Sequence, residues 1–137
     1  MARIVFCEDD PMIRKLIRLT LRGTLHDVSI ASDGLAGLAL IEREQPDLVV
    51  TDVSMPGLDG LQLADALVAR PHLAAIPLVV ISAAAQHAQI EEAERHHVAG
   101  YLTKPFSPAA LRALIDRLVG EIPSADDRRP DDAGDPR

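Results

Sequence analysis

The chain has 137 residues, an apolar fraction of 47% and a formal net charge of −7 at pH 7. This length suits one compact domain, since such a chain can bury roughly two thirds of its unfolded surface around a single core. The negative charge argues against nucleic-acid binding, and the lack of a signal-peptide pattern or of an apolar stretch near the roughly 20 residues of a membrane span predicts a cytoplasmic protein without membrane contact. The only cysteine, Cys7, lies in an apolar run, which predicts a buried thiol and no internal disulfide.

Short apolar runs alternate along the chain with longer segments of helical period. This is the pattern of repeated strand–helix units, in which helices cover both faces of a parallel sheet. The apolar runs predict five strands, near residues 3–8, 27–31, 47–52, 77–82 and 99–103. The expected fold class is therefore α/β, with a doubly wound five-stranded parallel sheet.

Capping residues mark where the helices between these strands begin. The pairs are Asp10–Pro11, Asp33–Gly34, Asp59–Gly60 and Ser107–Pro108. The first and last helices carry an apolar stripe along one face, which we expect to pack in the core. The stripe residues are Ile13, Leu16, Ile17, Thr20 and Leu21 in the first helix, and Leu111, Leu114, Ile115 and Leu118 in the last.

Two segments carry weaker structural signals. Residues 86–96 predict a helix with a thin apolar face, and such a face favours mobility. Residues 121–137 hold six acidic and three basic side chains and almost no apolar ones, so they cannot repay the entropy cost of ordering. We expect one domain over residues 1–120, followed by a disordered acidic tail over 121–137.

Polar side chains recur at the carboxyl ends of four of the five predicted strands. They are Glu8, Asp9 and Asp10 after the first strand, Thr51 and Asp52 at the end of the third, Ser82 at the end of the fourth and Lys104 after the fifth. In open parallel sheets this edge binds ligands, above all where the strand order reverses. With strand order 2-1-3-4-5, the four strands become neighbours, and the second strand, which lacks such a residue, lies outside them.

The charges of this cluster favour a bound metal ion. Asp9 and Asp52, with Glu8 nearby, would repel one another unless a cation lay among them. Mg²⁺ prefers oxygen ligands and is commonly held by one or two carboxylates together with phosphate oxygens, so it suits this set. Zinc does not, because Cys7 is isolated and the histidines are scattered.

Lys104 and Ser82 supply groups that suit a phosphoryl group. Lys104 offers a movable positive charge, and Ser82 offers a hydroxyl donor. An aspartate beside a metal can attack phosphorus, which would form an aspartyl phosphate while the metal and Lys104 neutralise the transferring group.

Four separated motifs resemble the receiver domain of bacterial response regulators. They are I-V-F-C-E-D-D-P-M-I-R at 4–14, D-L-V-V-T-D-V-S-M-P-G-L-D-G at 47–60, V-V-I-S-A at 79–83 and G-Y-L-T-K-P-F at 100–106. The resemblance covers residues 3–119. It implies the flavodoxin-like (α/β)5 fold of the chemotaxis-type receiver, with strand order 2-1-3-4-5.

The resemblance also implies a role for each site residue. Asp52 would be the phosphoacceptor, Asp9 a direct Mg²⁺ ligand, Glu8 a ligand acting mainly through water, and the Ser54 backbone carbonyl a further ligand. Ser82 and Lys104 would contact the phosphoryl group, and the Lys104–Pro105 peptide bond would be cis.

The implied output is a change of surface. Ser82 would be drawn to the phosphoryl group and the ring of Tyr101 would turn inward, which would remodel the face formed by the predicted helix 86–96, the fifth strand and the last helix. The phosphoryl donor would be a histidine kinase or a histidine phosphotransfer protein, and a downstream target protein would read the face. Formation of a homodimer through this face is a further alternative. The chain would be a self-catalysed switch rather than an enzyme that turns over a substrate.

Several alternatives stand beside this interpretation. Asp10 is explained by helix capping, with metal-site support as the second reading, and Tyr101 could simply pack at the sheet edge. A Mg²⁺-dependent aspartyl-phosphate phosphatase would carry a D-x-D motif, but here Ser54 occupies the position of the second aspartate. A receiver excised from a longer response regulator or hybrid kinase, and a pseudo-receiver used only for interaction, are further candidates. Ala84, two residues beyond Ser82, offers no polar group to attacking water.

Overall fold

The structure is a computed structural model, and it describes residues 2–83 and 98–121. The predicted helix at 86–96, Ala84 and the tail from residue 122 onward lie outside the described residues. Within them, no helix combines the length and the apolar character that crossing a membrane requires.

Five parallel strands form one sheet in the order β2-β1-β3-β4-β5. Their bounds are β1 Arg3–Cys7, β2 Asp27–Ala31, β3 Leu48–Asp52, β4 Leu78–Ala83 and β5 Gly100–Lys104. The predicted strands are confirmed to within one residue at each end. The predicted order is confirmed as well, so that β1, β3, β4 and β5 are contiguous and β2 lies at an edge.

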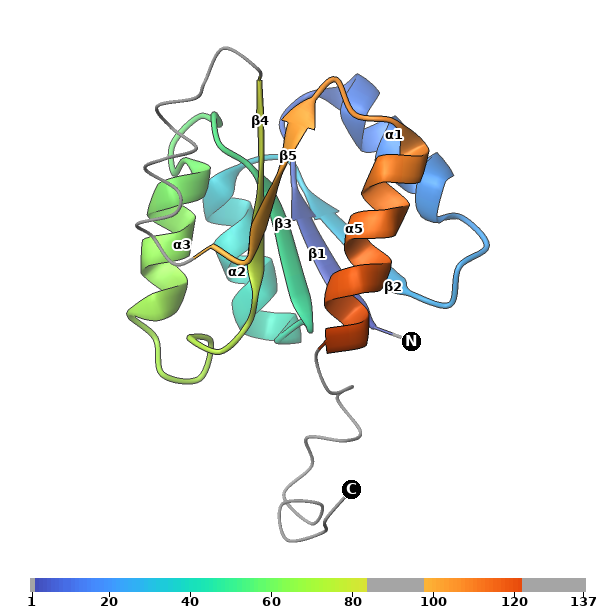
Figure 1. The fold of residues 1–137 in the computed structure, drawn as a ribbon. Helices are drawn as coiled ribbons and strands as arrows, with labels where there is room; N and C mark the ends of the chain where they lie inside the picture. Colours follow the sequence, from blue (N-terminus) through green and yellow to red (C-terminus); the bar gives the residue numbers. More distant parts are fainter. Residues whose placement is uncertain (1, 84–97, 122–137) are drawn as a thin grey trace, which may run out of the picture.

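Four helices described in the structure cover the two faces of the sheet (Figure 1). Their bounds are α1 Pro11–Leu21, α2 Gly34–Glu44, α3 Gly60–Val68 and α5 Pro108–Glu121. Helices α1 and α5 lie on one side of the sheet, and α2 and α3 lie on the other. The described part of the chain is thus the three-layered, doubly wound α/β arrangement that the sequence predicts.

The predicted caps hold the starts of all four helices. The carboxylates of Asp10, Asp33 and Asp59 accept hydrogen bonds from the backbone N–H groups of Met12, Ala36 and Gln62 at 2.9, 2.7 and 2.8 Å. Ser107 Oγ accepts one from the N–H of Ala110 at 3.0 Å. These bonds satisfy N–H groups that have no partner inside the helix, and they fix where each loop above the sheet turns into a helix.

Two apolar cores fill the spaces between the sheet and its helices. The core on the α1 and α5 side contains Ile4, Phe6, Leu48, Val50, Val79 and Ile81 from the strands and Ile17, Leu21, Leu111, Ile115 and Leu118 from the helices. The core on the other side contains Val5, Cys7, Val49 and Val80 with Ile41, Leu63 and Leu67. The residues of both predicted helix stripes are buried or packed against the α1 and α5 core, except Leu16, which is half-buried. The predicted burial of Cys7 is confirmed, and burial raises the pKa of its thiol to about 12.

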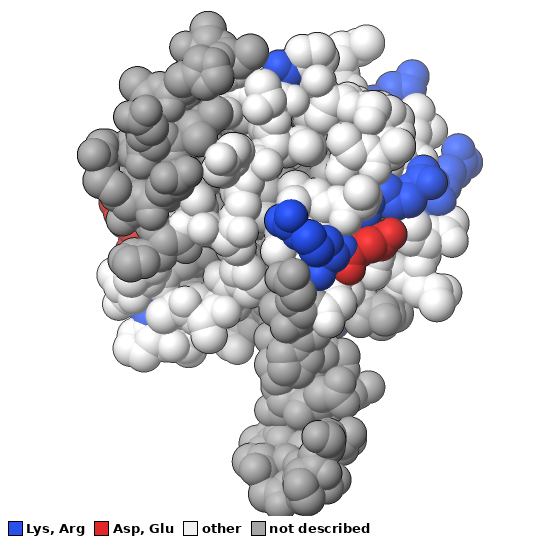
Figure 2. Space-filling model, viewed as in Figure 1, with Lys and Arg blue, Asp and Glu red and all other residues white. Residues whose placement is uncertain are grey.

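Charge is spread unevenly over the surface. Figure 2 shows Lys and Arg side chains gathered over the α1 and α5 side of the molecule. Lys15, Arg18, Arg112 and Arg117 are exposed residues of these two helices. This face therefore carries a group of positive charges, although the chain as a whole has a net negative charge.

Candidate functional site

The alternation of side chains along the strands brings three charged residues to one face of the sheet. Along β3, Leu48 and Val50 face the α1 and α5 core, and Asp52 continues that alternation. Glu8 follows Ile4 and Phe6 in the same way, and Lys104 follows Leu102 on β5. Because successive side chains of a strand point to opposite faces, these three residues converge at the carboxyl edge of the sheet.

Lys104 joins the two carboxylates of this group. Its Nζ donates a hydrogen bond to Asp52 Oδ2 at 2.7 Å and forms an ion pair with Glu8 Oε1 at 3.3 Å. Burial works to lower the pKa of Lys104, but the hydrogen bond and charge of Asp52 and the charge of Glu8 outweigh it, so that the pKa is raised. Lys104 therefore stays protonated and acts as a fixed positive charge rather than as a proton donor.

Glu8 is fully buried, at 0% exposure, although it carries a carboxylate. Burial and the charge of Asp52 raise its pKa to about 7, against the opposing effects of the Asp10 backbone N–H and of Lys104. Its Oε1 receives no hydrogen bond from the described residues, since the 3.3 Å contact with Lys104 has the distance of an ion pair but not the geometry of a hydrogen bond. A buried carboxylate oxygen left in this condition is suited to a cation.

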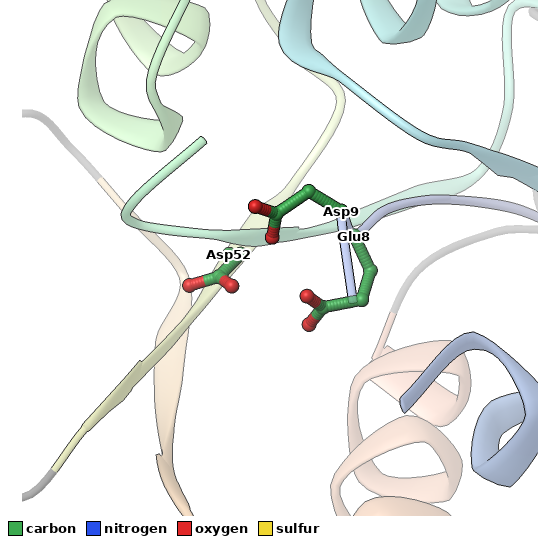
Figure 3. A group of neighbouring side chains, drawn as sticks. All are labelled: Glu8, Asp9 and Asp52. Atoms are coloured by element: carbon green, nitrogen blue, oxygen red, sulfur yellow. The ribbon is translucent and has the colours of Figure 1, made fainter. Parts of the chain in front are cut away.

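Asp9 completes an acidic cluster with Glu8 and Asp52. One carboxylate oxygen from each lies within 4.8 Å of the others, and the three side chains turn toward a common space in Figure 3. A hollow of about 400 Å³ opens beside the cluster and is lined in part by Asp9, Ser54 and Asp59. Hard oxygen donors, one of them buried and lacking a hydrogen-bond donor, fit a hard divalent cation.

Ser82 and Ser54 lie beside Asp52 in different ways. Asp52 pairs with Ile81 across the β3–β4 register, and Ser82 is the next residue. Ser82 is 0% exposed, and its Oγ finds no hydrogen-bond partner among the described residues. Ser54 follows β3, and its backbone N–H donates to Asp52 Oδ1 at 3.3 Å. The structure thus brings together the predicted residues Glu8, Asp9, Asp52 and Lys104, with Ser54 and Ser82 adjacent.

The remaining predicted features are Tyr101, Asp10 and a peptide bond. Tyr101 lies on β5 and is 44% exposed, so its ring is not packed in the core. The Lys104–Pro105 peptide bond is cis, as the family resemblance implies. Asp10 caps α1, which confirms its first reading.

Two hydrogen bonds at the site were not predicted. Arg14 donates them to the backbone carbonyl oxygens of Glu8 and Asp9. Its place in the first turns of α1 was visible in the sequence, but no spacing rule indicates that a helix arginine reaches back to the preceding loop.

Comparisons with known proteins agree with this geometry. The family described as the response regulator receiver domain matches residues 4–116. The chain is 33% identical over 121 residues to chemotaxis protein CheY-3 of Vibrio cholerae, an alignment that covers 88% of this chain and 93% of that protein. It is 34% identical over 131 residues to response regulator protein FleR of Pseudomonas aeruginosa, covering 94% of this chain and 27% of that protein.

Solved structures give the same result. The receiver domain of the Francisella response regulator 1452 is 29% identical, with a TM-score of 0.79, and the similarity covers 88% of this chain and 98% of that one. Chemotaxis response regulator CheY4 of Vibrio cholerae is 25% identical, with a TM-score of 0.80, covering 86% and 98%. The chain therefore belongs to the response regulator receiver domain family, the phosphoacceptor switches of two-component signalling.

Proposed function

We propose that Asp52 accepts the phosphoryl group and that Lys104 and Ser82 contact it. The observation that carries this proposal is the contact of Lys104 Nζ with Asp52 Oδ2 at 2.7 Å, inside a cluster that also contains Glu8 and Asp9. A carboxylate oxygen of Asp52 attacks phosphorus, the P–N bond of a donor phosphohistidine breaks, and the electron pair stays on the donor imidazole. Lys104, held protonated by its two acidic neighbours, compensates charge on the phosphoryl oxygens.

The cation of this site is proposed to be Mg²⁺. Asp9 and Asp52 would bind it directly, Glu8 would bind it mainly through water, and the Ser54 backbone carbonyl would complete the set. When bound, the ion neutralises negative charge on the transferring group. The buried hydroxyl of Ser82 has no partner among the described residues, so it is available to a phosphoryl oxygen.

The proposed partners follow from this chemistry. A histidine kinase or a histidine phosphotransfer protein in the cytoplasm supplies the phosphoryl group. A downstream protein reads the face that includes β5 and α5, where exposed Tyr101 would turn inward after phosphorylation. The segment 86–96, which the family resemblance adds to this face, lies outside the described residues. The chain acts as a switch that carries one phosphoryl group and does not turn over a substrate.

The test is to phosphorylate the protein chemically and to locate the phosphate. Incubation with acetyl phosphate and Mg²⁺ should add one phosphate per chain by intact mass, and EDTA should prevent it. Reduction of the acyl phosphate with borohydride converts the modified aspartate to homoserine, which peptide mapping should find at position 52. Modification at another residue would remove Asp52 from the role, and sustained hydrolysis of phosphate esters would favour the phosphatase alternative.

A further inference from the structure

Arg14 holds the backbone of the acidic loop from helix α1. It is half-buried, and its Nη1 donates to the carbonyl oxygen of Glu8 at 3.0 Å and to that of Asp9 at 2.9 Å. Hydrogen bonds from a charged donor are stronger than those between neutral groups. A single nitrogen therefore fixes two successive peptide groups of the loop that carries two of the three clustered carboxylates.

The second of these peptide groups connects Arg14 to the Glu8 side chain. The carbonyl of the Asp9–Asp10 peptide accepts from Arg14, and its N–H, which belongs to Asp10, donates to Glu8 Oε2 at 3.1 Å. A trans peptide is planar, and its C=O and N–H point in opposite directions, so orienting one end orients the other. The guanidinium and the Glu8 carboxylate thus lie at the two ends of one peptide dipole, and each strengthens the other's hydrogen bond.

This arrangement decides which oxygen of Glu8 remains for the cluster. Oε2 is engaged by the Asp10 N–H, whereas Oε1 faces Lys104 without a hydrogen bond from the described residues. The main chain of Glu8 is also held on both sides, because its N–H donates to the Ala31 carbonyl at 3.0 Å while its own carbonyl accepts from Arg14. The Glu8 carboxylate therefore has little freedom to rotate away.

We propose that Arg14 is a positioning residue of the metal site, which acts through the Asp9–Asp10 peptide to aim the Glu8 carboxylate at the bound cation. The inference rests on the proposed function. Groups that orient metal ligands without touching the metal typically contribute about ten-fold or more to metal affinity.

A competing effect has the opposite sign and makes the inference testable. Arg14 carries a positive charge near a cation site, so charge repulsion alone predicts that removing it strengthens Mg²⁺ binding. Positioning predicts that removing it weakens binding. The direction of the change, rather than its size alone, separates the two roles.

The experiment is a Mg²⁺ titration of the ¹⁵N-labelled full chain, followed by amide chemical shifts. Arg14→Met keeps an apolar stem and removes the donors, and Arg14→Lys keeps the charge on a shorter side chain. Arg70→Met is the matched control, because Arg70 Nη1 also donates to a backbone carbonyl, that of Ala66 at 2.8 Å, at a position outside the acidic cluster.

We expect Arg14→Met to raise the Mg²⁺ dissociation constant about ten-fold. Arg14→Lys should lie between that variant and the native protein, and Arg70→Met should match the native protein. In the metal-free protein, hydrogen exchange at the Asp10 amide should become about ten-fold faster in Arg14→Met, with exchange in β3 unchanged. With acetyl phosphate, the Mg²⁺ concentration for half-maximal phosphorylation should rise, while the rate at saturating Mg²⁺ stays within about two-fold of native.

Unchanged or tighter Mg²⁺ binding by Arg14→Met would overturn the inference while leaving the proposed function intact. Absence of Mg²⁺ binding by the native protein would overturn the metal site itself, and the positioning role with it. If Arg14→Met does not fold, Arg14→Lys decides. Weaker Mg²⁺ binding with faster exchange at Asp10 supports positioning, and native values for both overturn it.

Discussion

Strand β3 has a buried aspartate at each end, and the two differ in their surroundings. Asp47, just before the strand, is 3% exposed, and it exchanges two bonds with Arg3, whose N–H donates to Asp47 Oδ2 at 2.9 Å and whose carbonyl accepts from the Asp47 N–H at 2.7 Å. Asp52, at the other end, is 5% exposed and shares its space with two further carboxylates and Lys104.

Asp47 supports the fold, whereas Asp52 is the acid that we propose to be reactive. Asp47 ties β3 to β1 through neutral backbone groups, which is the usual way to satisfy a buried polar side chain. Asp52 lies among like charges, where folding alone gains little from a carboxylate. A buried acid that crowds other acids at the carboxyl edge of the sheet therefore favours a chemical role, whereas hydrogen bonds to backbone groups, as at Asp47, favour a structural one.

The strongest way to break this comparison is to neutralise each aspartate in turn. Asp52→Asn should lower phosphorylation by acetyl phosphate at least about a thousand-fold, because the proposed nucleophile is lost. Asp47→Asn should leave phosphorylation unchanged and reduce the free energy of unfolding by about 1 kcal/mol, because its hydrogen bonds weaken. Intact mass and urea titration measure the two effects. Phosphate uptake by Asp52→Asn would erase the distinction between the two ends.

Lys104 allows a second test of the carboxyl edge. Lys104→Met removes the positive charge beside Asp52 and should slow phosphorylation about 100-fold at saturating Mg²⁺. The chain's other lysine, Lys15, is exposed on α1, so Lys15→Met is the control and should keep the native rate. Equal rates for both variants would show that the 2.7 Å contact with Asp52 has no part in the reaction.

Glu8 sharpens the comparison through pH. Its pKa of about 7 in the folded protein exceeds the usual 4.5, so the folded state binds the proton more tightly than the unfolded state. In EDTA, the native protein should therefore lose stability relative to Glu8→Gln as pH rises from about 4.5 to about 7. The variant should be more stable by up to about 3 kcal/mol at pH 8 and no more stable at pH 4.5.

Glu42 provides the control of opposite sign. A hydrogen bond from His72, with the charges of His72 and Arg70, lowers the pKa of Glu42, although desolvation works to raise it. Glu42 therefore contributes stability above its unfolded pKa, and the contribution disappears as pH falls. Chemical denaturation across the pH range should show Glu42→Gln less stable than the native protein near neutral pH. If the stability differences of Glu8→Gln and Glu42→Gln from the native protein changed with pH in the same direction, the pKa shifts assigned to both residues would be contradicted.

A further prediction concerns the glycine that begins α3. A Cβ at Gly60 would collide with the backbone carbonyl oxygen of Asp52, so Gly60→Ala should lower the free energy of unfolding by about 2 kcal/mol and displace Asp52. Gly120 in α5 has open space around it, and Gly120→Ala should not lower stability, since alanine is favoured over glycine in helices. Thermal unfolding measures both. A Gly60→Ala variant with native stability would show that β3 and α3 are not packed as tightly as described.

Most strands and helix starts of this fold could be predicted from local sequence patterns. Apolar runs such as Ile4–Cys7 and Leu48–Val50 marked the strands, and Asp10, Asp33, Asp59 and Ser107 marked the helix starts, because burial periodicity and capping depend on neighbouring residues. The site residues could be predicted as a set because the carboxyl ends of parallel strands meet at one edge. The hydrogen bonds of Arg14 could not be predicted, because they depend on the conformation of the loop after β1.

The sequence by itself determined which chemical groups occupy the carboxyl edge of the sheet: three acids, a lysine and a hydroxyl at the ends of four strands. Only the tertiary structure decided how these groups are paired, that Glu8 is fully buried with a raised pKa, and which of its oxygens is engaged by the Asp10 amide. The reason is physical. Hydrogen-bond geometry and desolvation depend on distances between residues far apart in the chain, such as Asp52 and Lys104, and those distances are set by register and packing.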